Sequence, residues 1–360
     1  MQMKEAEAVE LVEKTSLAGL ADLNTDVVYT HVEFLGRELP GPVDLYQRWE
    51  RQQWSATEID FSVDRQQWEG LHRGVRDQLE GTFGGFFYGE QAVTDTLSPL
   101  VMGAPDEENR LFLSTQVVDE ARHSYFFARV YHDVLGVAGG LREALAHVGE
   151  VRQSTGGYGR IFEPNGGELV TVTDAVRRDP RNYALWVQGI TLYHLMIEAL
   201  LALPGQRRIL RLLRASDLLP GFRAGFTAVT RDESRHVSYG VWALRQAVRN
   251  GHEADIRTVV DRLLPHCFGV YANAQVKLPD PRNLPPTARL DPREQWAFSV
   301  EALTKRLRSA GAASDYIAGV DRRAWELIWG GVARYEQHHG EEHPVRRWER
   351  GEVTAAAGGS

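Results

Sequence analysis

The chain has 360 residues, of which 43% are hydrophobic, so it is long enough for one large or two ordinary domains with a sizeable core. Its formal net charge of −8 argues against a nucleic-acid-binding surface. The single cysteine, Cys267, excludes an internal disulfide and a cysteine-based metal site, and it suits a reducing compartment.

Residues 1–63 are predicted to form an irregular arm with short helical pieces, interrupted at Pro40-Gly41-Pro42. Aromatic side chains such as Trp49 and Trp54 are expected to pin this arm to a core. The acidic start of the chain lacks the apolar stretch of a signal peptide, so we expect a cytoplasmic protein. The most apolar run, 190–203, is too short to span a bilayer.

Two long helices are predicted next. Asp64 is a plausible N-cap for a helix that continues to about Met102. Asp106 opens a second helix, roughly 107–135, which Gly136 closes. The second helix carries an apolar stripe at alternating spacings of three and four residues, with two polar side chains, Glu120 and His123, in its middle. Buried polar groups need partners, and one metal ion could satisfy both.

The rest of the chain also reads as helical. A connection at 137–181 is followed by an apolar helix at about 182–214, with a kink at Pro204, and by a helix at about 220–249. Further helices are expected near 253–277, 292–310 and 321–337. With no convincing strand, the prediction is an all-α protein with an arm at 1–63, a bundle at 64–278, C-terminal helices at 279–350 and a disordered tail at 351–360.

The pattern D-E-x-R-H occurs twice, at 119–123 and at 232–236. In each copy Glu and His are three residues apart, so both point the same way from a helix. A single Glu-x-x-His is a weak signal, but two copies with the same flanking Asp and Arg predict a metal site. The ligands offered by the two copies are Glu120, His123, Glu233 and His236.

A helical bundle that binds two metal ions needs one further Glu from each of two partner helices. Glu90 and Glu198 fit, because each stands in an apolar run where a lone carboxylate is costly unless paired. A carboxylate-rich set with one His per ion favours iron or manganese over zinc. The alternative is a set of buried salt bridges in a plain helical bundle.

The neighbouring Asp and Arg residues are expected to support the ligands. Asp119 and Asp232 can accept hydrogen bonds from the imidazole nitrogens that face away from the metals. Arg122 and Arg235 can in turn neutralise these carboxylates.

At these residues the chain resembles the ferritin-like dimetal-carboxylate proteins, and over roughly residues 50–270 it is most similar to the ribonucleotide-reductase-small-subunit-like ligand-binding oxidases. The segments Gly89–Val93 and Tyr193–Glu198 carry this closer likeness. In that family a valine and a tyrosine at the positions of Val93 and Tyr193 become joined by an ether cross-link.

The resemblance implies a ferritin-like bundle, a homodimer, and a heterodinuclear Mn/Fe cofactor, with two Fe ions as the other possibility. It assigns Glu90 and His123 to the first ion, and it places Glu120 between the ions. It likewise assigns Glu198 and His236 to the second ion and places Glu233 between them. It also implies O2 activation and a long-chain fatty acid, or similar hydrophobic ligand, whose carboxylate bridges the metals.

The predicted activity is an O2-dependent two-electron C–H oxidation that draws on an unidentified electron donor. A multicomponent-monooxygenase-type hydroxylase and a ribonucleotide reductase small subunit are the enzyme alternatives; a non-catalytic lipid- or metal-binding protein is an alternative of another class. Phe127 disfavours the reductase, because reductases carry their radical tyrosine at this position, four residues after the first motif's His. The 137–181 connection and the chain beyond about 280 exceed the family pattern and could reshape the ligand tunnel or the dimer contact.

Overall fold

Two helix pairs form the centre of the fold, which a computed structural model describes for residues 5–155, 159–163, 166–269, 271, 274, 277–285 and 289–354. In the first pair, α5 (Arg73–Thr96) packs along α7 (Glu107–Arg129). In the second, the π-helical segment η4 (Thr191–Ala202) packs along α13 (Pro220–Arg249). Every regular element among the described residues is helical, so the prediction of an all-α bundle is confirmed.

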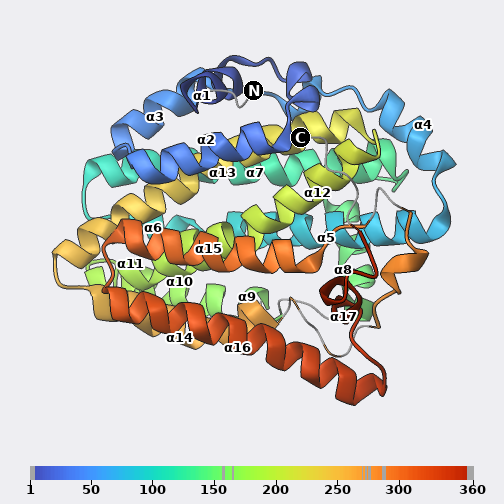
Figure 1. Ribbon diagram of the computed structural model, residues 1–360. Coiled ribbons are helices and arrows are strands. Elements are labelled where there is room, and N and C mark those ends of the chain that lie inside the picture. Colours follow the sequence, from blue (N-terminus) through green and yellow to red (C-terminus); the bar gives the residue numbers. More distant parts are fainter. Residues whose placement is uncertain are drawn as a thin grey trace.

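The remaining helices surround these two pairs (Figure 1). They are α1 (Glu5–Lys14), α2 (Thr25–Glu38), α3 (Pro42–Arg51), α4 (Ser62–Gly70), α6 (Ser98–Met102), α8 (Leu141–Thr155), α9 (Gly159–Phe162), α10 (Glu168–Arg178), α11 (Tyr183–Ile190), α12 (Leu203–Ala215), α14 (Glu253–Gly269), α15 (Pro292–Ala310), α16 (Ser314–His339) and α17 (Val345–Glu349). The helix α13 packs against α2 and α15, while α14 and α16 pack together at the lower edge of Figure 1.

The helix α7 follows the sequence prediction closely. The Asp106 side chain accepts a hydrogen bond from the backbone N–H of Asn109 at 2.9 Å, which caps the first turn. A π-helical turn at Val130–Val134 extends the helix, and Gly136 follows with a φ of 78°. The predicted stripe, including Glu120 and His123, is buried.

The predicted helix from Asp64 to Met102 is wrong in its continuity, because the chain bends between α4 and α5 and again between α5 and α6. Asp64 does not cap its own helix. Its carboxylate accepts hydrogen bonds from the backbone N–H groups of Gly221 (2.8 Å) and Phe222 (2.7 Å). It therefore caps the first turn of α13, some 150 residues away, where free N–H groups favour a negative charge.

The apolar stretch predicted at 182–214 is one helical run formed by α11, η4 and α12. Pro204 lies in the first turn of α12, and the preceding segment is π-helical, a form often found at functional sites. The run Tyr183–Ala215 is long and apolar enough to cross a membrane by length and composition. However, 83% of its most apolar window is buried inside the protein, as in a core helix.

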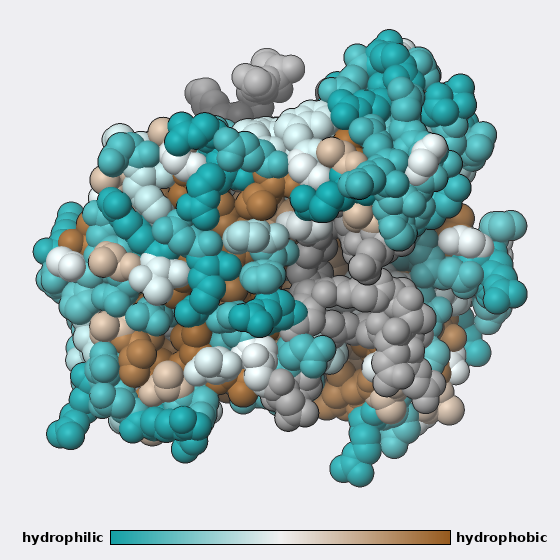
Figure 2. All heavy atoms as spheres, turned by 90° about the horizontal axis from the view of Figure 1, so that it is seen from below, coloured by the Kyte–Doolittle hydropathy of each residue, from teal (hydrophilic) through white to brown (hydrophobic). Residues whose placement is uncertain are grey.

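The N-terminal arm is more helical than predicted, since α1, α2 and α3 form most of it. The helix α3 packs on α7, and α2 packs on α13, so the arm covers both motif helices. At the other end, the last part of the predicted disordered tail, 355–360, lies outside the described residues. The face seen in Figure 2 is mainly hydrophilic, with smaller hydrophobic areas between the polar side chains.

Candidate metal centre

The structure brings the six predicted ligands together in the middle of the bundle. Glu90 comes from α5, Glu198 from η4, and each motif helix contributes its own Glu and His. All six side chains are buried. Their ligand atoms form two adjacent groups, Glu90, Glu120, His123 and Glu233 in one and Glu120, Glu198 and His236 in the other.

The distances show which carboxylates are shared. His123 Nδ1 lies 3.3 Å from Glu90, 3.4 Å from Glu120 and 3.6 Å from Glu233. His236 Nδ1 lies 3.3 Å from Glu120 and 3.5 Å from both Glu198 and Glu233. Glu120 and Glu233 are shared, because each has one oxygen near His123 and its other oxygen near His236. Glu90 faces only His123, and Glu198 faces only His236. Donors bound to one metal at about 2 Å lie about 3 Å apart, so each group is of a size to hold one ion.

Four carboxylates in one buried cluster are electrostatically costly without cations. Burial raises the pKa of Glu90 to about 8, and burial also raises the pKa of Glu198 well above its ordinary value. Burial acts in the same direction on Glu120, but the two imidazoles, whose Nδ1 atoms lie 3.4 and 3.3 Å from its oxygens, hold its pKa well below the ordinary value.

Several of the predicted ligand atoms make no hydrogen bond to the protein. Glu198 Oε2, Glu233 Oε2 and His236 Nδ1 are buried without a hydrogen-bond partner among the described residues. Orphaned polar atoms of this kind are rare in folded proteins. The donor set and its unpartnered atoms therefore fit a pair of metal ions.

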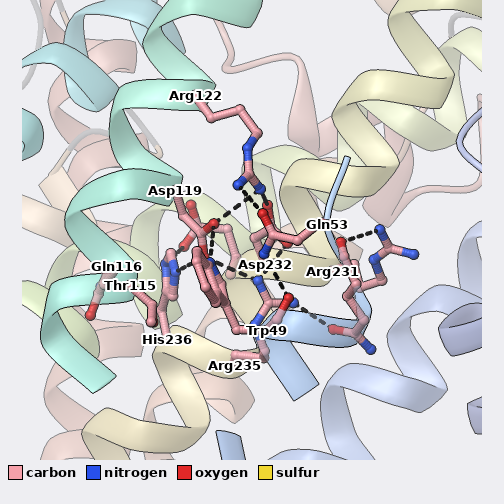
Figure 3. Close-up of polar contacts among 12 residues, drawn as sticks. Trp49, Gln53, Thr115, Gln116, Asp119, Arg122, Arg231, Asp232, Arg235 and His236 are labelled. Atoms are coloured by element: carbon pink, nitrogen blue, oxygen red, sulfur yellow. Dashed lines mark hydrogen bonds and ion pairs between the residues drawn. The ribbon is translucent and has the colours of Figure 1, made fainter. Parts of the chain in front are cut away.

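The Asp residues of the two motifs support the imidazoles crosswise. His123 Nε2 donates to Asp232 of the other motif at 3.2 Å. His236 Nε2 donates to Asp119 at 3.1 Å (Figure 3). Because a carboxylate can only accept, each hydrogen bond places a proton on Nε2, so Nδ1 is the nitrogen that faces the clustered glutamates and would bind a metal. We had expected these contacts but not their exchange between motifs.

The crosswise pairing predicts a crosswise loss of metal affinity. The Asp232→Asn variant is expected to weaken the ion bound by His123 by about 10–100-fold, because the imidazole loses its charged acceptor. Asp119→Asn should weaken the ion bound by His236 instead. Competition with a chelator, followed by anomalous diffraction, measures the occupancy of each position. Equal losses at both positions in each variant would contradict the pairing.

One buried arginine links the two Asp residues. Arg235 donates from Nη2 to Asp119 at 3.0 Å and to Asp232 at 2.6 Å, and Figure 3 shows it between the motif helices. Arg122 donates to Asp119 at 3.1 Å and lies 3.5 Å from Asp232. The two arginines thus neutralise the two carboxylates as a group, rather than one each.

The N-terminal arm supplies contacts that sequence reasoning missed. Trp49 Nε1 donates to Asp119 at 2.9 Å, and Trp54 Nε1 donates to Asp232 at 2.7 Å. Each Asp therefore accepts from an indole, an imidazole and a guanidinium. The tryptophans were expected only to pin the arm to the core, and nothing in their spacing marks them as partners of the motifs.

The π-helical segment carries Tyr193, His194 and Glu198, and Gln116 of α7 links the last two. Tyr193 is buried and donates its O–H to Glu120 at 2.8 Å. Gln116 donates to Glu198 at 2.8 Å and accepts from His194 at 2.9 Å. A Cβ at position 240 would lie 2.1 Å from the Cβ of His194, so only Gly240 allows η4 and α13 to approach this closely.

A cavity of about 760 Å³ begins at the cluster. Its inner end is lined by Val93 and by all four glutamates, Glu90, Glu120, Glu198 and Glu233. It continues between α5 and α12, and its outer part is lined by the C-terminal region, including Leu284, Trp296 and Trp348. Most of the wall is apolar, as in pockets that hold hydrophobic ligands.

The comparisons with known proteins agree with this arrangement. A family model described as ribonucleotide reductase, small chain, matches residues 37–137. A structure of a variant of an R2-like ligand-binding oxidase with anaerobically reconstituted Mn/Fe cofactor is similar, with 20% identity, a TM-score of 0.57, and coverage of 80% of this chain and 93% of that one. A structure of R2-like ligand-binding oxidase with aerobically reconstituted metal cofactor after photoconversion shows the same identity and TM-score, covering 84% and 93%. The fold and the predicted resemblance are thereby confirmed.

Proposed function

We propose that this protein is a dimetal oxidase that uses O2 to carry out two-electron oxidation of C–H bonds. The observation that carries the proposal is the pair of Glu/His groups that share Glu120 and Glu233 and open on an apolar cavity. A bound Mn/Fe pair, or two Fe ions, would supply the redox chemistry. The solved structures with Mn/Fe cofactor support this choice of metals.

The chain's own residues would hold the two ions in distinct ways. Glu90 and His123 would hold one ion, Glu198 and His236 the other, and the two shared carboxylates would fix the distance between them. Asp119 and Asp232 each accept from an imidazole Nε2, which directs both Nδ1 atoms toward the ions. The surrounding packing excludes bulk water from the carboxylates, so C–H oxidation would be confined to whatever occupies the cavity.

The substrate is a hydrophobic molecule, and a long-chain fatty acid fits the volume and the apolar lining of the cavity. The reductase alternative is disfavoured by Phe127, which is fully buried at the position of the reductases' radical tyrosine and has no hydroxyl. Tyr125, two residues after His123, is 46% exposed and points away from the cluster. We further expect the protein to be cytoplasmic and to form a homodimer. Light scattering would test the dimer by measuring its mass in solution.

Val93 and Tyr193 are proposed to form an ether cross-link. Val93 lines the cavity beside the glutamates, and the Tyr193 hydroxyl is bonded to Glu120, so both border the same cluster. The reaction breaks the Tyr193 O–H and Val93 Cβ–H bonds and joins Tyr193 Oη to Val93 Cβ. The two protons and two electrons that are released reduce O2 to H2O2. Glu120 is placed to accept the phenolic proton.

Intact-mass measurement tests the cross-link and the function together. After the metal-free protein is loaded with Mn and Fe in air, the mass of the 93–193 pair is expected to fall by two hydrogens. Loading without O2 should leave the mass unchanged, and Tyr193→Phe should not show the loss. An unchanged mass in air with both metals bound would contradict the cross-link, whereas binding of zinc alone would contradict the oxidase.

A further inference from the structure

The two carboxylates that are not shared, Glu90 and Glu198, have different surroundings. Around the two motifs the hydrogen bonds are symmetric, since each Asp accepts from the imidazole of the other copy. Glu198 Oε1 also accepts a hydrogen bond from the side-chain amide of Gln116 at 2.8 Å. The carboxylate of Glu90 has only His123 as a hydrogen-bond partner among the described residues. The two halves of the cluster are therefore not equivalent.

A buried histidine fixes the orientation of the amide. Because a carboxylate can only accept, Gln116 turns Nε2 toward Glu198 and Oε1 toward His194. His194 Nε2 donates to that oxygen at 2.9 Å. His194 is held in turn, because its Cβ packs against Gly240, where an added Cβ would lie only 2.1 Å away. These contacts form a directed chain of hydrogen bonds that ends on Glu198, and all of its side chains are buried.

The corresponding sequence positions in the other half are apolar. Gln116 stands four residues before the Glu of the first motif, and the residue four before the Glu of the second motif is Val229. His194 stands four residues before the unshared carboxylate of its own segment, and the corresponding residue on α5 is Phe86. Val229 is fully buried, and the Phe86 ring packs edge-on against Phe226 at 4.9 Å. Neither side chain can donate a hydrogen bond to a carboxylate.

Tyr193 adds to the same imbalance. Its hydroxyl donates to Glu120 at 2.8 Å from a position five residues before Glu198. Five residues before Glu90 the chain has Gly85, which has no side chain to offer. The segment that carries the tyrosine is π-helical, whereas α5 is α-helical. The polar support is thus concentrated on the side of Glu198.

We infer that Gln116 and His194 are positioning residues that hold Glu198 in one orientation, so that the two metal positions differ in rigidity. The inference rests on the proposed function for the presence of two ions. Ligating carboxylates are commonly held by hydrogen bonds from residues behind them, and loss of such a partner lowers metal affinity by about 10–100-fold. The ion at His236 would then have a fixed unshared ligand.

Glu90 is the adjustable ligand in this arrangement. Both unshared carboxylates line the inner end of the cavity, but only that of Glu198 is tied to an amide. Turning Glu198 away would leave the buried amide of Gln116 unsatisfied, which costs free energy. Turning Glu90 away has no such cost. The ion at His123 is therefore the position that can admit a further ligand from the cavity.

The affinity test uses Gln116→Met, since methionine is similarly long and flexible but has no N–H donor. The metal-free, full-length protein is titrated calorimetrically with Mn2+, and anomalous diffraction at limiting Mn2+ assigns each position. Gln116→Met is expected to weaken the position at His236 by about 10–100-fold and to leave the position at His123 unchanged. The matched control is Thr115→Val, which removes a buried hydroxyl that bonds only to a backbone carbonyl of its own helix, and it should change neither position. Equal weakening of both positions by Gln116→Met, or no weakening at His236, would overturn the inference.

A double-variant cycle tests the role of His194. His194→Phe leaves the amide of Gln116 free to turn over, so it should weaken the position at His236 to a smaller extent. Adding His194→Phe to Gln116→Met should cause no further loss, because the imidazole acts only through the amide. Additive losses would show that His194 does not position Glu198 through Gln116.

Crystal structures of the metal-free protein separate this inference from the proposed function. The wild type should show Glu198 in one orientation and Glu90 in more than one, and Gln116→Met should show both in more than one. A single orientation of Glu90 in the wild type, or of Glu198 in the variant, would overturn the inference whether or not metals bind. If the wild type binds neither Mn2+ nor Fe2+, the proposed function fails by itself, and these structures still decide whether Gln116 fixes Glu198.

Discussion

The Glu120→Ala variant is expected to lose both metal ions at once. The two oxygens of Glu120 lie 3.4 Å from His123 Nδ1 and 3.3 Å from His236 Nδ1, so one substitution removes a ligand from each ion. The O2-dependent oxidation should fall by more than about 100-fold, because even residues that only orient a ligand contribute 10–100-fold. Elemental analysis after desalting, together with O2 consumption, measures both effects.

Two variants serve as controls for this result. Glu90→Ala removes a carboxylate that faces only His123, so it should retain one ion per chain. Glu80 lies ten residues earlier on the same helix. Its side chain contacts His147 at 2.6 Å and does not belong to the cluster. Glu80→Ala should retain both ions. Retention of both ions by Glu120→Ala, with its helical circular dichroism intact, would show that Glu120 is not shared.

The six clustered residues could be predicted from the sequence because helix geometry is local. A Glu and a His three residues apart must share a face, and a repeated motif marks two such faces. Glu90 and Glu198 were recognisable because each stands in an apolar run, where burying an unpaired carboxylate costs free energy. The predicted starts of α7 and α13 were also correct, because Asp106 and Pro220 act within one turn of their own helices.

The contacts that were missed are tertiary. Trp49 and Trp54 meet carboxylates 70 and 178 residues away, and Asp64 caps a helix 157 residues away. Neither hydrophobic period nor capping rules specify such partners. The exchange of Asp119 and Asp232 between the two imidazoles belongs to the same class, because it depends on how α7 and α13 face each other.

The π-helical form of η4 was equally hidden, since its residues would suit an α-helix. It matters because the segment carries Tyr193, His194 and Glu198 into the cluster. The C-terminal region was predicted only as a possible modifier of the tunnel. In the structure, residues such as Leu284 and Trp348 line the cavity, so this region shapes the space next to the metals.

The Arg235→Met variant is expected to lower the free energy of unfolding of the metal-free protein by about 3–5 kcal/mol. Arg235 is fully buried and donates to Asp119, Asp232 and the side chain of Gln52. Its loss leaves two buried carboxylates with only Arg122 and the indole and imidazole donors to compensate them. Urea unfolding followed by circular dichroism measures the change.

The matched control is an arginine of the surface. Arg323 forms an ion pair with Asp261 at 2.8 Å, and both side chains are exposed. Arg323→Met should cost at most about 1 kcal/mol, because water screens such a pair. Adding Asp119→Asn and Asp232→Asn to Arg235→Met should recover part of the stability, since it removes the charges that the arginine had compensated. A cost for Arg235→Met no larger than that for Arg323→Met would mean that Arg122 alone neutralises both carboxylates, and that Arg235 serves only to hold the two motif helices in register.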